Sequence, residues 1–471
     1  MTERRRWLAF YLLCAGELMI VIDTTIVNVA LPSIQASLRF SDSSLVWVVN
    51  AYMVTYGGFL LLGGRLGDLY GSRRLFLLGT AIFTAASLAC GLAASQGLLV
   101  GARAIQGLGG AAVSAIALSL IMNLFSETAE RAKAMGIYGF ICAGGGSIGV
   151  LAGGVLTSAL SWHWVFLVNL PIGALVCALC FTLLAPDVAP AERRRLDVAG
   201  AVTVTSASML AVYAIVGAHY GLLAAAAGLF LVFLVLESRV QDPLMPLRLF
   251  RIRSVAVANV IGVFWAAAMF AWFFISALYM QLVLGYTPMQ IGLAFLPANV
   301  IMAVFSIGLS APLVMRFGLK PPIIAGMLLS ALGLALFAIA PASAPSGGSF
   351  LWHVLPGMIL LGIGCGMALN PVMLAALNDV DPAESGLASG VVNTSFMMGG
   401  ALGLAVLASL AAARTGQVRM AGGAEAIALH AGYQLAFVIG AAFAAGTALL
   451  GWFALRHPRG GSQVSAADGV A

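Results

Sequence analysis

The chain has 471 residues, of which 62% are hydrophobic and only 8% are charged. This composition excludes an ordinary soluble globular protein and indicates that lipid is the solvent. The formal net charge of +6 comes from 23 lysines and arginines against 17 acids. Because these basic residues gather beside apolar stretches, we attribute the excess to membrane topology and expect a lipid bilayer, not a nucleic acid, as the partner.

The apolar stretches run on for about twenty residues without alternating, which predicts transmembrane helices rather than the strands of a barrel. Fourteen such stretches occur, at residues 8–30, 46–64, 75–94, 98–121, 134–157, 164–185, 198–217, 221–237, 254–280, 289–314, 321–340, 352–376, 386–413 and 431–455. We therefore expect an all-α integral membrane protein with fourteen transmembrane helices.

The basic residues predict the orientation of these helices. With the N-terminus in the cytoplasm, nineteen lysines and arginines fall on that side, three lie outside (Arg39, Arg414 and Arg419), and Arg103 lies within a span. This asymmetry predicts that both termini are cytoplasmic, in the inner membrane of a cell. The first apolar run follows Arg4–Arg6 as a signal peptide would, but Glu17 interrupts it and more spans follow, so we expect a retained helix.

Three charges lie inside apolar runs, where each costs about 2.5–3.5 kcal/mol on insertion scales: Glu17, Asp23 and Arg103. Such residues normally face a protein interior or a wet cavity and bind ions, protons or substrate. A low-dielectric cavity favours the protonated form of a carboxyl, so we expect Asp23 to take up protons outside and release them inside. The alternative is a carboxylate satisfied by the backbone and by Thr24 or Thr25.

Glu17 precedes Asp23 by six residues, which places it about 120° away around the helix. Both acids could face one broad cavity and exchange protons for a cationic substrate, or Glu17 could pair structurally with Arg103. Arg103 is expected either to relay protons or to belong to a purely structural pair. Gln106, one turn further along, could share its network.

An internal repeat divides the chain. The segments 64–73 and 311–320 both end in an aromatic residue, a glycine, any residue and a base, and their glycines, Gly71 and Gly318, lie 247 residues apart. This offset predicts two six-helix halves, residues 1–186 and 251–457, related by a parallel repeat. Residues 187–250 are then a linker with two inserted helices and charged boundaries, and residues 458–471 are a cytoplasmic tail, expected to be disordered.

The fifth predicted helix carries Gly145, Gly149 and Gly153 at four-residue spacing, followed by Gly154. Small residues at this spacing favour close packing and sliding of helices. Residues 144–149 also satisfy the glycine pattern of nucleotide-binding loops, but they open no soluble βαβ unit, so no nucleotide is expected.

Several side chains are candidates for lining a substrate cavity: Asn28, Gln106, Trp265, Met269, Trp272 and Asn393. The two tryptophans and Met269 share one face of the ninth predicted helix and could hold a lipophilic cation by stacking. A stripe that packs or faces lipid is the alternative. Cys177 and Cys180 form a C-x-x-C within an apolar run, with no second pair nearby, so neither a metal nor another cofactor is expected.

Four motifs resemble those of the major facilitator superfamily, and more narrowly of its fourteen-span drug:proton antiporters. They are residues 23–32 in the first helix, residues 64–74 in the second-to-third loop, residues 103–107 in the fourth helix and residues 162–173 at the entry to the sixth. The chain departs from the family at Val150, where the exporter motif carries proline, and at His163, where arginine is more usual.

The resemblance implies a transporter rather than an enzyme, driven by the proton gradient without a cofactor, that acts as a monomer and exports small lipophilic drugs, dyes or antibiotics. It assigns proton coupling to Asp23 and Arg103, and a cytoplasmic latch to the loop motif, in which Gly67 and Gly71 would permit a tight turn. The full set of loop residues is Gly64, Arg65, Gly67, Asp68, Gly71, Arg73 and Arg74. Two alternatives stay open: a proton-coupled importer of a small metabolite, and a receptor or lipid-handling protein that transports nothing.

Overall fold

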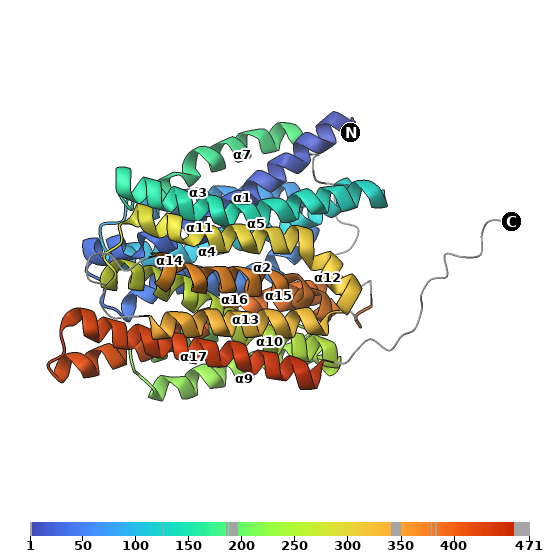
Figure 1. Ribbon diagram of the computed structural model, residues 1–471. Coiled ribbons are helices and arrows are strands. Elements are labelled where there is room, and N and C mark those ends of the chain that lie inside the picture. Colours follow the sequence, from blue (N-terminus) through green and yellow to red (C-terminus); the bar gives the residue numbers. More distant parts are fainter. Residues whose placement is uncertain are drawn as a thin grey trace.

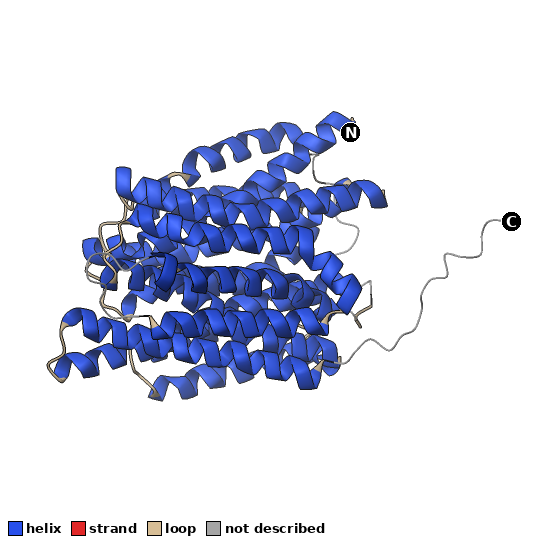
Figure 2. Ribbon diagram, viewed as in Figure 1, coloured by secondary structure: helices blue, strands red, loops and turns tan. Residues whose placement is uncertain are grey.

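The computed structural model describes residues 2–125, 127–184, 187, 196–340, 350–377, 379–381 and 384–455. Within these ranges the chain is helical and contains no strand (Figure 2). The predicted tail at 458–471 and most of the charged boundary at 188–195 lie outside the described residues. The same holds for the side chain of Asp68.

The first part of the chain forms α1 (Glu3–Leu38), a short turn η1 (Ser44–Val46), α2 (Trp47–Tyr70), α3 (Ser72–Gly91), α4 (Gln96–Leu124), α5 (Thr128–Ala159), α6 (Trp164–Leu167) and α7 (Asn169–Leu183). Two helices follow, α8 (Val198–Val216) and α9 (Gly221–Arg239), and then the turn η2 (Leu247–Arg251). The last part forms α10 (Arg253–Leu278), η3 (Tyr279–Val283), α11 (Pro288–Val304), η4 (Phe305–Leu309), α12 (Ser310–Phe317), α13 (Lys320–Ile339), α14 (Phe350–His353), α15 (Leu355–Leu377), α16 (Ser385–Met420) and α17 (Glu425–Ala454).

Thirteen helical segments of the described chain are long and apolar enough to cross a bilayer. The tenth predicted span, residues 289–314, is a shorter helix, α11, which continues through the π-helical turn η4 into α12. The all-α membrane fold expected from the sequence is therefore confirmed. The first span is longer than predicted, because α1 extends over 36 residues and begins with the basic stretch that precedes the apolar run.

The helices form a lengthwise bundle in which α1 begins and α17 ends at the same end, hereafter the terminal end (Figure 1). Helices α1 to α5 and α7 pack mainly on one another, as do α10, α11, α13, α15, α16 and α17. The main contacts between these groups are those of α2 with α16 and of α5 with α11, and α1 also touches α10 and α11. Helices α8 and α9 pack together, and α8 lies against both α2 and α16.

Local sequence explains where the helices start and stop. Thr287 and Gln290 form a reciprocal capping box at the start of α11, which satisfies backbone N–H groups that a helix leaves unpaired. Gly71 and Gly318 adopt φ of 100° and 76°, a left-handed conformation that favours glycine, and they separate α2 from α3 and α12 from α13. Both halves of the predicted repeat thus place a glycine with positive φ at equivalent positions.

The predicted tight turn at Gly67 is wrong. Residues 64–70 belong to α2, and the chain leaves the helix only at Gly71. The absence of a side chain at Gly67 has a packing reason instead, because a Cβ there would lie 2.0 Å from Cδ1 of Ile116 in α4.

Candidate functional site: a buried ion pair between α1 and α4

Asp23 lies near the middle of α1 and is fully buried, with an exposed fraction of 0%. Its Oδ2 accepts a hydrogen bond of 2.5 Å from Nη1 of Arg103, which lies on α4 and is 1% exposed. A carboxylate removed from water is stable only when it is paired and hydrogen-bonded, and this partner supplies both the charge and the donor.

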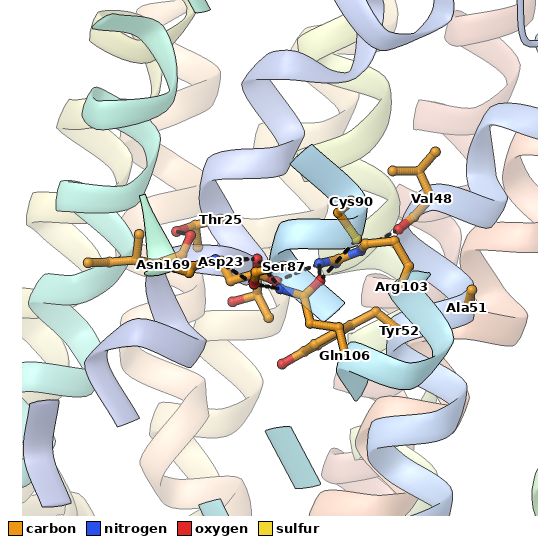
Figure 3. A network of polar contacts seen from close by, with 12 residues as sticks. Asp23, Thr25, Val48, Ala51, Tyr52, Ser87, Cys90, Arg103, Gln106 and Asn169 are labelled. Atoms are coloured by element: carbon orange, nitrogen blue, oxygen red, sulfur yellow. Dashed lines mark hydrogen bonds and ion pairs between the residues drawn. The ribbon is translucent and has the colours of Figure 1, made fainter. Parts of the chain in front are cut away.

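Polar side chains from two further helices complete the environment of Asp23 (Figure 3). Its Oδ1 accepts hydrogen bonds from Nε2 of Gln106 in α4 at 2.8 Å and from Nδ2 of Asn169 in α7 at 2.9 Å. Both amides also reach Oγ of Ser87 in α3, at 2.7 and 3.3 Å. We call these five residues, Asp23, Ser87, Arg103, Gln106 and Asn169, the acid network. It joins α1, α3, α4 and α7 at one buried point.

The guanidinium of Arg103 has further partners besides Asp23. Its Nε donates to the backbone carbonyl of Val48 at 2.9 Å, and its Nη1 donates to Oε1 of Gln106 at 2.7 Å. The guanidinium carbon lies 4.4 Å from the ring centroid of Tyr52, a distance typical of a cation–π contact. Arg103 is thus held in place from α2 as well as from α1.

Glu17 is buried separately from the acid network. It is 7% exposed and lies beside Ser114 of α4 and Tyr138 of α5. The expected alternative in which Glu17 pairs with Arg103 is wrong, because the guanidinium contacts Asp23 instead. The rotation of about 120° between the two acids places them against different neighbours.

Of the predicted cavity-lining residues, only Gln106 joins Asp23. Asn28 and Asn393 donate to backbone carbonyls one turn earlier in their own helices, those of Thr24 and Ser389. Neither contacts the acid network. Asn169 lies within the family motif at residues 162–173, but the sequence did not assign it to the site. Ser87 was missed as well, because it looks like any small residue in an apolar helix.

The aromatic stripe of α10 is buried in the protein. Trp265 and Trp272 are 2% and 1% exposed, so the lipid-facing alternative is excluded. Trp265 packs against Phe396 of α16, and Trp272 against Phe295 of α11. The indole Nε1 atoms of both tryptophans are buried without a hydrogen-bond partner among the described residues. Side-chain atoms of Asn259, Gln281, Asn299 and Thr394 in the same part of the chain are also buried without such a partner among the described residues.

The glycines of α5 lie against two different helices. A Cβ on Gly149 would stand 2.0 Å from Oγ1 of Thr25 in α1, and one on Gly153 would stand 2.7 Å from the carbonyl of Ile26. Gly145 faces Val21 of α1 in the same way. Gly154, by contrast, faces the carbonyl of Pro288 in α11 at 2.9 Å. The stripe therefore seats α5 on α1, and Gly154 seats it on α11.

The loop motif makes contacts that its sequence did not predict. Arg65 donates to the backbone carbonyls of Asp242 and Pro243, in the segment that follows α9. The backbone N–H groups of Arg73 and Arg74 donate to the carboxylate of Asp187 at 2.8 and 3.1 Å. A carboxylate at a helix N-terminus is favoured by the helix dipole, so Asp187 caps α3. Its position far along the chain explains why sequence reasoning missed it.

The family model described as Major Facilitator Superfamily matches residues 13–404. The chain belongs to the Major Facilitator Superfamily. It is therefore a multi-pass membrane transporter of small molecules rather than an enzyme.

Among curated relatives, the chain is 37% identical over 462 residues to the puromycin resistance protein pur8 of Streptomyces alboniger, covering 96% of this chain and 91% of that protein. It is 39% identical to the cephamycin export protein CmcT of Amycolatopsis lactamdurans, covering 86% and 85%. It is 38% identical to the multidrug resistance protein Stp of Mycobacterium tuberculosis, strain CDC 1551 / Oshkosh, covering 84% and 74%.

Solved transporters share the fold. A variant of the nucleoside transporter NupG superposes with a TM-score of 0.66 at 12% identity, covering 95% of this chain and 100% of that one. An auto-inhibited peptide transporter of the POT family superposes with a TM-score of 0.67 at 17% identity, covering 94% and 96%. At these identities the likeness concerns the fold alone.

Proposed function

We propose that the chain is a proton-coupled exporter of small lipophilic molecules, including cationic drugs, dyes and antibiotics. The observation that carries this proposal is the fully buried ion pair of Asp23 and Arg103. A passive scaffold gains little from such a pair, because burying two charges costs more than their attraction generally returns. A transporter that binds and releases protons needs one carboxyl that can change its charge inside the protein.

The acid network suggests how a proton would act. Ionised Asp23 accepts hydrogen bonds from Arg103, Gln106 and Asn169, so its charge holds three donors from two helices. A proton on Asp23 would remove that charge and weaken its hold on Arg103. Arg103 would keep its bond to the Val48 carbonyl and its contact with the Tyr52 ring, which would limit the cost of the unpaired state. Each proton that crosses inward would supply about 2.3 kcal/mol per 100 mV of membrane potential.

Relatives support the nature of the cargo. The names of the three reported relatives refer to puromycin, to cephamycin and to multiple drugs, and two of them state resistance while one states export. Export is outward movement of a small organic molecule, and the same movement is how a membrane transporter would confer resistance. We propose the same direction here, although Val150 replaces the proline of the family's exporter motif.

For the arrangement in the membrane, we propose that the terminal end of the bundle faces the cytoplasm and that the protein acts as a monomer in the inner membrane. The basic residues support this orientation, because lysines and arginines gather on the cytoplasmic side of membrane proteins. Arg5 and Arg6 lie at the terminal end, where they bond to Thr182 and Glu130. The halves 1–186 and 251–457 would rock about the contacts of α2 with α16 and of α5 with α11, with residues 187–250 as the inserted pair. The loop motif would hold the cytoplasmic side closed in one state.

A reconstitution experiment tests this function. Purified protein is placed in liposomes with a pH-sensitive dye inside, a proton gradient is imposed, and puromycin and a panel of lipophilic cations are added in turn. We expect an active compound to trigger proton movement opposite to its own, and Asp23→Asn to abolish that signal. Glu127→Gln, which alters an exposed acid before α5, is the matched control and should behave like the wild type.

Two outcomes would contradict the proposal. Protons that move in the same direction as the compound would indicate an importing symporter. Equal transport by the wild type and Asp23→Asn would show that the buried ion pair carries no proton coupling.

A further inference from the structure

A second pair of acids is buried in the two inserted helices. Asp197 precedes α8 as its N-cap residue, and Glu237 lies in the last turn of α9. Because α8 and α9 are consecutive and antiparallel, the start of one and the end of the other meet at the terminal end of the bundle. Each residue is only 3% exposed. The sequence indicated a charged boundary here, and the structure places these two charges inside the protein instead.

Each carboxyl has one oxygen that is satisfied and one that is not. Oδ1 of Asp197 accepts a hydrogen bond of 2.7 Å from the backbone N–H of Gly200, and Oε2 of Glu237 accepts one of 2.9 Å from the backbone N–H of Met245. The other two oxygens, Oδ2 of Asp197 and Oε1 of Glu237, are buried and lack a hydrogen-bond donor among the described residues. A buried acceptor without a donor is costly, and two in one place call for a shared explanation.

The two bare oxygens face the same point in space. A Cβ built on Gly200 would lie 2.5 Å from Oδ2 of Asp197 and 2.7 Å from Oε1 of Glu237. Only glycine leaves room for both carboxyls at this place. Two ionised carboxylates so close together repel each other strongly, particularly away from water.

The surrounding charges do not neutralise the pair. Arg65 of α2 is the basic residue close enough to act on Glu237, but its guanidinium donates to the carbonyls of Asp242 and Pro243. Asp242 lies in the segment after α9, and its backbone carbonyl is one of the two that Arg65 holds. No ion pair joins Asp197 or Glu237 to a base in the part of the chain that the structure describes. A proton between the two bare oxygens supplies what the geometry lacks: one carboxyl becomes a donor, the other accepts, and one charge disappears.

We propose that Asp197 and Glu237 share one proton and form a second proton-binding site, separate from the acid network, that holds residues 240–246 against the loop motif. Glu237 holds this segment through Met245, and Arg65 holds it through two carbonyls. Leu244 packs in the same place with Leu62 of α2 and Ala201 of α8. When the proton leaves, repulsion between the carboxylates pushes Glu237 away and loosens the segment to which Arg65 is bonded. The protonation of the pair in the inserted helices thereby affects the contacts of Arg65 in the loop motif.

Infrared spectroscopy of the purified protein in nanodiscs tests the shared proton without any transport. Protonated carboxyl groups absorb at a different infrared frequency from carboxylates, so the intensity of their band reports how many carboxyls carry a proton. We expect the double variant Asp197→Asn/Glu237→Gln to lose the equivalent of one protonated carboxyl relative to the wild type. The control Asp242→Asn, which removes a neighbouring acid outside the pair, should lose none. An unchanged band in the double variant, or a loss of two carboxyls, would overturn the proposal.

Hydrogen exchange of residues 240–246 tests the consequence. In the double variant the side chains at positions 197 and 237 would be amides that can bond to each other and carry no titratable proton. Residues 240–246 of that variant should therefore stay protected from exchange at every pH. The wild type should match the double variant at acidic pH and lose protection relative to it at alkaline pH. If the ratio of the exchange rates of residues 240–246 in the two proteins stayed constant across the pH range, the link to the loop motif would be overturned. Since neither readout involves a substrate, failure here is distinguishable from failure of the export function.

Discussion

Asn50 in α2 donates a hydrogen bond of 2.8 Å to the backbone carbonyl of Ala401 in α16, and Asn50 is fully buried. This bond joins the two groups of helices across 351 positions of sequence. In hydrocarbon surroundings an interhelical hydrogen bond of this kind contributes about 0.6–2 kcal/mol. It is therefore a directed interaction at the contact between α2 and α16.

Replacing this amide should weaken the joint. We expect Asn50→Ala to lower the free energy of unfolding by about 1 kcal/mol and to loosen α2 from α16. The measurement is thermal unfolding in detergent, together with the rate of cross-linking between cysteines placed on the two helices. Asn393→Ala is the control, because that amide bonds only within its own helix. Equal effects of the two substitutions would show that the interhelical bond contributes nothing special.

Arg103→Lys tests whether shape matters as well as charge. An ammonium can reach Asp23 but cannot also hold the Val48 carbonyl and lie flat over Tyr52. Hydrogen bonds from charged groups contribute about 1.5–3 kcal/mol, so we expect proton-coupled transport to fall by about tenfold to a hundredfold. Transport in liposomes measures this. Wild-type rates in Arg103→Lys would mean that a point charge suffices.

Gly149→Ala should separate α5 from α1. The added methyl would stand 2.0 Å from Oγ1 of Thr25 and 2.9 Å from the carbonyl of Ile22, and backbone cannot move aside cheaply. Overpacking of this kind costs about 1–3 kcal/mol. The matched control is Gly144→Ala in the same helix, where a Cβ meets nothing within 4 Å. Thermal unfolding of the two variants should differ clearly, and similar values would argue against close packing at Gly149.

The opposite end of the bundle carries an exposed charge cluster. Arg419 lies 3.5 Å from Asp42, contacts Glu425 at shorter range, and is 44% exposed as a side chain. Solvent and salt screen such pairs, so Arg419→Gln should cost no more than about 1 kcal/mol, and less at high ionic strength. Melting temperatures at low and high salt would measure this. A large loss that persists in high salt would contradict a screened surface cluster.

The partial burial of His163 predicts that the stability of the protein depends modestly on pH. Partial burial, against Trp162 at a ring distance of 3.7 Å, holds the pKa of His163 below its ordinary value. The unfolded chain then binds a proton more readily than the folded one, so stability falls as pH drops through about 6.5. His163→Gln should flatten that part of the profile of melting temperature against pH. An identical slope in the variant would assign the effect to another group.

Much of the site followed from sequence because membranes restrict where charges lie. Asp23 and Arg103 stood out as charges in apolar helices, and Gln106 followed from its spacing to Arg103. The choice of Asp23 over Glu17 as the partner of Arg103 could not be read from the sequence, since both acids lie on α1 and the angle between them leaves either choice possible. Tertiary packing makes that choice.

Residues supplied by distant segments were the hardest to predict. Ser87 and Asn169 lie 64 and 146 positions beyond Asp23, and neither carries a charge that marks it. Asp197 and Glu237 were seen, but as ordinary boundary charges. Their burial depends on how α8 and α9 fold back against α2, which no local pattern encodes.

The acid network links four helices through a single carboxyl group. The carboxyl of Asp23 in α1 accepts hydrogen bonds from α4 and α7, and the amides of Gln106 and Asn169 that donate to it also bond to Ser87 in α3. Four helices thus meet at one buried carboxyl. A change in the charge of that carboxyl reaches contacts made by all four helices. The four helices therefore share one anchoring point, and a chemical event at that point bears on all of them.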